Sequence, residues 1–96
     1  MYKALGNLSL DLLRAFETAA RHRSFTAAAM ELGTTQPAVS QQIKRLEEQL
    51  AVRLFDRIYR GIELTDAGRL LFEHVQAGLQ SINTGLSTIT QQDQHE

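Results

Sequence analysis

The stretch TQPAVSQQIKRLEEQL, residues 35–50, constrains this chain most, because it has the marks of an amphipathic helix. Thr35 can cap its start, and Pro37 is tolerated in the first turn, where a missing N–H has no helical partner anyway. Its apolar residues recur at steps of four, three and four and, at about 100° per residue, fall within an arc of roughly 60°. They are Val39, Ile43, Leu46 and Leu50. One narrow face of this helix should therefore pack against the rest of the domain.

The opposite face is polar and has no carboxylate before Glu47. It is formed by Gln36, Pro37, Ser40, Gln41 and Lys44. Such a surface suits the DNA major groove, because glutamine can bond base edges, hydroxyl and ammonium groups can bond phosphates, and a helix N-terminus attracts phosphate. An ordinary solvated helix face is about equally compatible with these residues. The choice between DNA contact and a solvated face therefore depends on the neighbouring segments.

Two further helices are predicted before this one. Ser9 can cap a helix over residues 10–21, and Ser24 can cap an alanine-rich helix over residues 25–32 that ends at Gly33. The core-facing residues of the first helix should be Leu12, Leu13, Phe16, Ala19 and Ala20. An alanine-rich helix, a short turn containing glycine and an amphipathic helix with a polar outer face together are typical of a helix-turn-helix.

After residue 50 the pattern changes to two short apolar runs, residues 54–55 and 62–64, that bracket a segment ending in glycine. We expect two strands joined by a turn, which would form a wing behind the helix-turn-helix. Arg57, Tyr59 and Arg60 should lie at or near its tip. Arginines of a wing usually contact phosphates or enter the minor groove, whereas the alternative is a set of solvated turn charges. The preceding motif favours DNA contact for Arg60.

A long last helix is predicted after its cap, Thr65, with a polar frayed end over residues 91–96. Its apolar residues alternate steps of three and four and form a heptad seam of nearly three repeats. They are Phe72, Val75, Leu79, Ile82, Leu86 and Ile89. Because one small domain does not need so long a stripe, the seam predicts pairing with a second copy. Gly78 and Gly85 lie beside it, where either close helix approach or relaxed selection would account for them.

Charge and composition narrow the functional class. The net charge is −1, but residues 1–60 hold nine Lys/Arg and six Asp/Glu, a balance of +3, whereas residues 61–96 hold one and five, a balance of −4. A basic front and an acidic tail fit a DNA-binding head with a helical appendage. Without cysteine, and with three scattered histidines, the chain offers no support for an enzyme, a metal site or a cofactor. No signal peptide or membrane-spanning run is visible, so we expect a soluble, cytoplasmic, nucleoid-associated protein.

These motifs together resemble the DNA-binding half of the LysR-type transcriptional regulators. The resemblance runs through LRAFETAARHRSFTAAAMEL (residues 13–32), TQPAVSQQIKRLEEQL (35–50), LFDRIYRGIELTDAG (54–68) and the last helix. It implies a mainly α winged helix-turn-helix, residues 1–64, with three helices and a two-stranded wing, followed by a linker helix for dimerisation, residues 65–96. It also implies a bacterial regulator that binds inverted repeats at promoters as a dimer. The first motif is similar to the branch containing regulators of glycine cleavage and of inducible β-lactamase.

Carried over residue by residue, the resemblance assigns roles to the positions found above. The DNA-facing residues of the recognition helix would be Gln36, Pro37, Ser40, Gln41 and Lys44, with Thr35 near a phosphate and Arg57 and Arg60 on the wing.

Three departures from the family pattern matter. Ala51 stands where glycine is usual, so the backbone there is either strained or continues the helix, and Thr34 replaces an apolar β-branched residue, which would loosen the turn. The family's effector-binding domain does not lie within these 96 residues, so we expect no small-molecule inducer to bind this fragment.

Two other interpretations stay open at this point. A protein-interaction or dimerisation module could keep the helical scaffold without binding DNA, but it would tend to carry apolar or acidic residues on the outward face of residues 35–50. A truncated regulator could instead pair with full-length partners and act as a dominant-negative.

Overall fold

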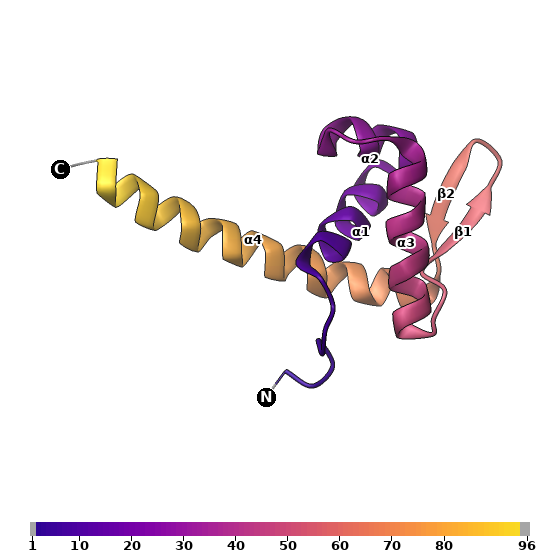
Figure 1. Cartoon of the computed structure of the whole chain (residues 1–96), viewed down its shortest axis with the longest axis horizontal. Helices are drawn as coiled ribbons and strands as arrows, with labels where there is room; N and C mark the ends of the chain where they lie inside the picture. Colours follow the sequence, from indigo (N-terminus) through magenta and orange to yellow (C-terminus); the bar gives the residue numbers. More distant parts are fainter. Residues whose placement is uncertain (1, 95–96) are drawn as a thin grey trace.

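The computed structural model describes residues 2–94, which form four helices and one two-stranded antiparallel sheet (Figure 1). In chain order the elements are α1 (Leu10–His22), α2 (Phe25–Leu32), α3 (Gln36–Leu50), β1 (Phe55–Ile58), β2 (Gly61–Leu64) and α4 (Asp66–Gln94). This is the winged helix-turn-helix with a long last helix that the sequence predicts, so the predicted fold class is confirmed.

Hydroxyl caps at the predicted positions determine where the first three helices begin. In each case the side-chain oxygen accepts a hydrogen bond from a backbone N–H two or three residues further on. The pairs are Ser9–Asp11, Ser24–Ala27 and Thr35–Ala38, at 3.1, 3.0 and 3.3 Å. Gly33 ends α2 in the left-handed conformation, with φ of 70°, so that only three residues separate α2 from α3.

The core is built around α1, which packs against α2, α3 and α4. The Phe16 side chain of α1 is fully buried, and its ring lies 5.6 Å from the ring of Phe55 and 6.5 Å from that of Phe72. The predicted seam of α3 closes the same core, since Val39, Ile43 and Leu46 are buried. The orientation of α3 about its own axis is therefore determined by its apolar face.

Ala51 ends α3 in the left-handed conformation, with φ of 56°. The N–H groups of Ala51 and Val52 donate to the carbonyl oxygens of Glu48 and Glu47, at 3.3 and 3.2 Å. Of the two outcomes expected for an alanine at this position, the structure shows the strained backbone, and the helix does not continue.

The wing has longer strands and a tighter turn than expected. Its antiparallel register pairs Phe55 with Leu64 and Ile58 with Gly61, which leaves only Tyr59 and Arg60 in the turn. The sequence predicts Arg57 at or near the tip; it lies near the tip and not in the turn, because it pairs with Ile62 inside the ladder, next to the last pair, Ile58 and Gly61. Pairing of the polar residues 56 and 57 extends the strand past the apolar run, and local hydrophobicity does not reveal such cross-strand bonds.

The start of α4 fits closely against the base of the wing. Thr65 accepts the N–H of Gly68 at 3.0 Å and donates its hydroxyl to the carbonyl of Arg53 at 2.7 Å, which confirms Thr65 as the cap. A Cβ atom added at Gly68 would lie 2.2 Å from the Leu54 carbonyl oxygen, so only glycine fits this contact.

The rest of α4 divides the predicted seam in two. Val75 is buried, and Phe72 and Leu79 pack at the edge of the core of the same chain. Beyond them the helix leaves the body as an arm (Figure 1), on which Ile82, Leu86 and Ile89 are 50, 56 and 57% exposed. None of the described helices is both long and apolar enough to cross a membrane.

Candidate nucleic-acid interface

The outward face of α3 carries the side chains that the sequence placed there. Because the seam of α3 is buried, Pro37, Gln41 and Lys44 are exposed, and Gln36 and Ser40 are partly exposed. The hairpin projects beside α3 (Figure 1).

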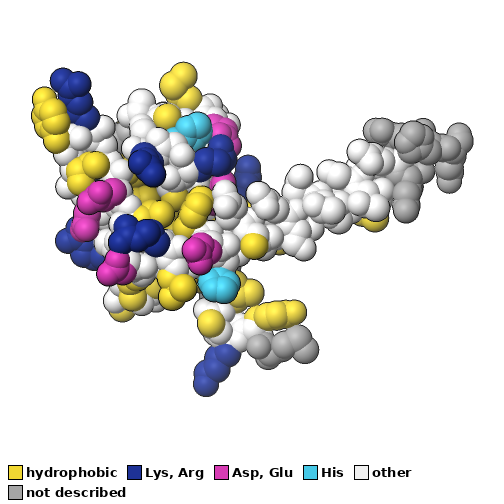
Figure 2. All heavy atoms as spheres, turned by 180° about the vertical axis from the view of Figure 1, so that it is seen from behind, with side chains coloured by type: hydrophobic (Ala, Val, Ile, Leu, Met, Phe, Trp, Pro, Cys, Tyr) yellow, Lys and Arg dark blue, Asp and Glu magenta, His cyan; other side chains and the backbone are white. Residues whose placement is uncertain are grey.

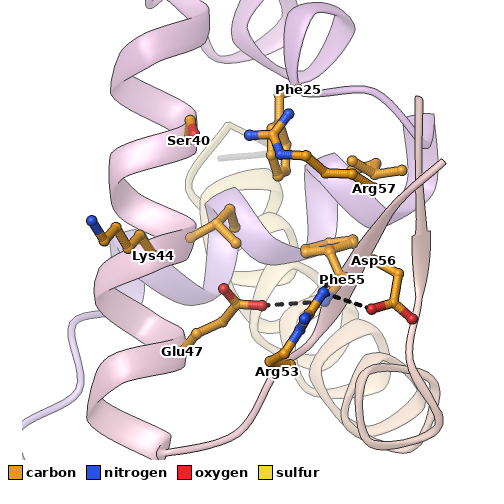
Figure 3. A pocket seen from close by; sticks show the side chains of 10 residues that line it. Phe25, Ser40, Lys44, Glu47, Arg53, Phe55, Asp56 and Arg57 are labelled. Carbon is orange, nitrogen blue, oxygen red and sulfur yellow. Dashed lines mark hydrogen bonds and ion pairs between the residues drawn. The ribbon is translucent and has the colours of Figure 1, made fainter. Parts of the chain in front are cut away.

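A groove of about 620 Å³ separates α3 from β1 (Figure 3). Ser40 and Lys44 belong to its α3 wall, and Arg57 and Phe25 stand together on the side that Ser40 faces. The structure thus brings two recognition-helix residues and one wing residue to a single groove.

The two carboxylates that line this groove, those of Glu47 and Asp56, already accept hydrogen bonds within the chain. The Glu47 carboxylate accepts the backbone N–H groups of Leu54 and Phe55, at 2.7 and 3.2 Å, and Arg53 donates to Asp56 at 2.7 Å. Within residues 2–94, by contrast, Lys44 and Arg57 have no carboxylate partner. The cations left without a partner favour an anionic ligand such as a phosphate.

A second groove, of about 320 Å³, lies between the wing and the starts of α2 and α3. It brings Gln36 together with Arg57 and Arg60. Gln41 lies elsewhere, in a hollow between α1 and α3 that Arg45 also lines. The predicted DNA-facing residues are therefore spread over three hollows along α3 and the wing and do not form one pocket.

The wing tip is exposed and carries a cation. Tyr59 is 86% exposed, and the guanidinium carbon of Arg60 lies 5.1 Å from the centroid of its ring. Arg60 has a left-handed backbone, with φ of 68°, in the two-residue turn. In the view from behind, basic and hydrophobic side chains project together at the end of the wing (Figure 2). The prediction that Arg60 lies at the tip is confirmed.

Arg21, in the last turn of α1, forms ion pairs within the chain. Arg21 bonds Glu17 at 2.8 Å and Glu31 at 2.7 Å, and a His22 ring nitrogen lies 2.7 Å from Glu31. The hydrogen bonds from Arg21, and then that from His22, hold the pKa of the Glu31 carboxyl at about 2, below its ordinary value of 4.5. This network ties α1 to α2 and leaves Arg21 outside the set of cations without a partner.

The arm of α4 differs from the globular part in its charge. Residues 75–92 contain no Lys, Arg, Asp or Glu, and charged side chains gather on the globular part instead (Figure 2). A Cβ atom added at Gly78 or Gly85 would have no neighbour within 4 Å. Nothing in the described part of a single chain therefore requires glycine at these two positions.

Sequence reasoning gave no role to Phe25, which lines the first groove. Phe25 begins a helix, and Arg57, which lies over its ring, is 32 positions away in sequence. Among the described residues no group of three or more His, Cys, Asp or Glu side chains could hold a metal ion.

Comparison with known proteins identifies relatives of this chain. Residues 10–69 match the family described as "Bacterial regulatory helix-turn-helix protein, lysR family". The HTH-type transcriptional regulator BlaA of Proteus vulgaris is 51% identical over 76 residues, 79% of this chain and 26% of BlaA. The carbapenem-hydrolyzing beta-lactamase transcriptional activator of Enterobacter cloacae is 46% identical over 79 residues, 82% of this chain and 27% of the activator. The chain thus spans about a quarter of the length of these two relatives.

A solved structure extends the similarity to a protein bound to DNA. The BenM DBD in complex with benA site 1 DNA matches with a TM-score of 0.80 at 31% identity, over 88% of this chain and 94% of that one. The similarity therefore covers most of the chain.

Proposed function

Because the chain belongs to the lysR family of bacterial regulatory helix-turn-helix proteins, we propose that it reads double-stranded DNA by placing α3 in the major groove. The observation that carries the proposal is the outward face of α3, whose glutamines, hydroxyl and lysine share one side of the molecule with the arginines of the wing. A helix of this width fits the major groove, and glutamine can bond adenine there through two atoms. The family is one of transcriptional regulators and not of enzymes.

The proposed contacts divide into two kinds. Gln36 and Gln41 would bond base edges, whereas Thr35, Ser40 and Lys44 would meet phosphates of the same groove. Pro37 would pack on the groove wall at the tip of α3. Arg57 and Arg60 would contact phosphates of the flanking DNA backbone or enter the minor groove. The affinity for DNA should therefore fall steeply as the salt concentration rises.

We further propose that two chains bind together, through α4, at an inverted repeat. Ile82, Leu86 and Ile89 are exposed on an arm without charges, and Gly78 and Gly85 would allow a second helix to approach closely. Phe72, Val75 and Leu79 would continue this contact only at their outer edges, because they already pack on the core of their own chain. In such a dimer two recognition helices would enter successive major grooves on one face of the duplex.

This function places the protein with chromosomal DNA in the bacterial cytoplasm. An interaction module that has lost DNA binding is the rival proposal, but it leaves the polar face of α3 and the wing cations without a role.

The deciding experiment is selection of binding sites by the purified chain from a library of random duplexes, followed by sequencing. An enriched inverted repeat would support a dimeric, sequence-specific reader. Enrichment of single half-sites would keep the reader and count against the dimer. Absence of enrichment at low salt would contradict DNA reading and support the interaction module.

Substitutions can then separate base reading from backbone contact. Gln41→Ala should relax base preference, at a cost of about 1–3 kcal/mol for a lost base contact. Arg60→Ala should instead weaken binding to all sequences and lower the salt dependence. Affinities measured on selected and scrambled duplexes test both; equal losses on the two duplexes for Gln41→Ala would contradict its role in base reading.

A further inference from the structure

The Arg57 guanidinium lies over the ring of Phe25, with 5.7 Å between the guanidinium carbon and the ring centroid (Figure 3). A cation within about 6 Å of an aromatic centroid is attracted by the electron-rich face of the ring. The contact joins the first residue of α2 to the middle of the wing, and it lies in the groove between α3 and β1.

The Phe25 ring is itself held in place by the core. It meets the Phe55 ring edge to face, with centroids 5.7 Å apart and an interplanar angle of 85°, and Phe55 packs in turn on the buried Phe16. Ser24 caps α2 one residue earlier, so the backbone at Phe25 is fixed as well. Phe25 is therefore a rigid platform, whereas a solvated arginine side chain on a wing strand would sample many rotamers.

The carboxylates near Arg57 are bonded to other groups, so the Arg57 guanidinium is available to bind an anion of a ligand. Its sequence neighbour Asp56 is bonded to Arg53 at 2.7 Å, and the Glu47 carboxylate accepts two backbone N–H groups. Stacking uses the flat face of a guanidinium and leaves the N–H groups at its edge for hydrogen bonds. Those N–H groups lie on the side of the groove that Ser40 faces.

We propose that Phe25 is a positioning residue for DNA-backbone recognition, because its ring holds the Arg57 guanidinium in the α3–β1 groove for a phosphate of the bound strand. In the proposed complex α3 enters the major groove and the wing meets the adjacent minor groove. The sugar-phosphate backbone that separates these two grooves would then pass between α3 and the wing. Phe25 acts through Arg57 and contributes no contact to a base. This inference rests on the proposed DNA binding and adds to it the residue that orders the wing cation.

A double-mutant cycle tests the role with a labelled duplex of mixed sequence at low salt, because a phosphate contact does not need the operator. Phe25→Leu should weaken binding by about two- to five-fold, as expected for loss of an exposed cation–π contact. Phe25→Tyr keeps the aromatic face and should bind like the parent chain. In the Arg57→Ala background, Phe25→Leu should cause no further loss, because the group it positions is gone.

The salt dependence distinguishes positioning from charge. Arg57→Ala should lower the slope of log affinity against log salt by about 1, whereas Phe25→Leu keeps the cation and should leave the slope unchanged. If Phe25→Leu does not fold, Arg57→Lys provides the same test, because it retains the charge and loses the planar stack. It should weaken binding with an unchanged slope.

Equal losses from Phe25→Leu in both backgrounds would overturn the positioning role, since Phe25 would then act through packing alone. No loss in either background would overturn it too. Failure of the parent chain to bind any duplex at low salt would instead overturn the proposed function. The stack has its own readout: the Arg57 Nε–H resonance should be displaced by the ring current of Phe25 and should move in Phe25→Leu, and a resonance that does not move would overturn the inference.

Discussion

Within residues 2–94, three residues other than glycine have a left-handed backbone, and each stands where one element meets the next. Arg23 joins α1 to α2, Ala51 ends α3 and Arg60 forms the wing turn, with φ of 55, 56 and 68°. This conformation costs a residue with a Cβ roughly 1–2 kcal/mol. Arg60 combines the strained backbone with a proposed role at the DNA, whereas Ala51 combines it with an exposed methyl group that nothing requires.

Ala51→Gly should therefore raise the free energy of unfolding by about 1 kcal/mol, because glycine adopts this conformation without steric cost. Urea denaturation followed by circular dichroism measures the change. The reciprocal control is Gly33→Ala at the end of α2, where φ is 70° and an added Cβ meets nothing within 4 Å. It should lower stability by a similar amount. An Ala51→Gly variant no more stable than the parent chain would contradict the strain at this residue.

At the level of elements, side-chain to backbone bonds hold the wing in place. The Glu47 carboxylate of α3 receives the N–H groups at the start of β1, and Gly68 of α4 lies against the Leu54 carbonyl. The position of the wing relative to the recognition helix therefore depends on these contacts at its base, while its tip extends into solvent.

Glu47→Ala should lower the free energy of unfolding by about 2–3 kcal/mol, because two partly buried N–H groups lose a charged acceptor. Glu48→Ala is the matched control, since Glu48 is exposed and should change stability by no more than about 0.5 kcal/mol. Both follow from urea denaturation curves. Equal, small effects of the two substitutions would show that the carboxylate does not hold the wing.

The α1–α2 corner should make stability depend on pH. Arg21 and His22 lower the pKa of Glu31 from 4.5 to about 2 in the folded chain. A carboxyl with a lowered pKa in the folded state stabilises the fold fully above the unfolded value, and this contribution is lost as the pH falls from 4.5 to 2. Over that range the parent chain should lose stability more steeply than Glu31→Gln. Arg21→Gln should flatten the curve in the same way, and parallel curves for all three proteins would contradict the network.

At the scale of the whole molecule, the extents along the three principal axes are 52, 33 and 20 Å, and the longest one reflects α4, which runs out of the globular part. One half of its apolar stripe packs on the core, and the other half is exposed within residues 75–92, a stretch of the helix without charged residues. An apolar stripe in this position explains why the proposed dimer would form on the arm and leave α3 and the wing accessible to DNA.

Leu86→Glu should break the proposed dimer, because it places a charge in the exposed part of the seam. The molar mass from light scattering should fall to that of one chain. Leu70→Glu is the control on the same helix, since Leu70 is 63% exposed but lies outside the seam, and it should leave the mass unchanged. An unchanged mass for Leu86→Glu would contradict pairing through α4.

The sequence by itself determined the elements, their caps and the outward face of α3. These features depend on neighbours within one or two turns: Ser9, Ser24 and Thr35 bond N–H groups two or three residues away, and the seam of α3 repeats every three or four residues. Only the tertiary structure decided that Arg57 lies inside a strand on Phe25, that Glu47 and Gly68 anchor the wing, and that half of the α4 seam already packs on the core of the same chain. Each of these contacts joins residues of different elements, and no local periodicity records which residue of another element a side chain will meet.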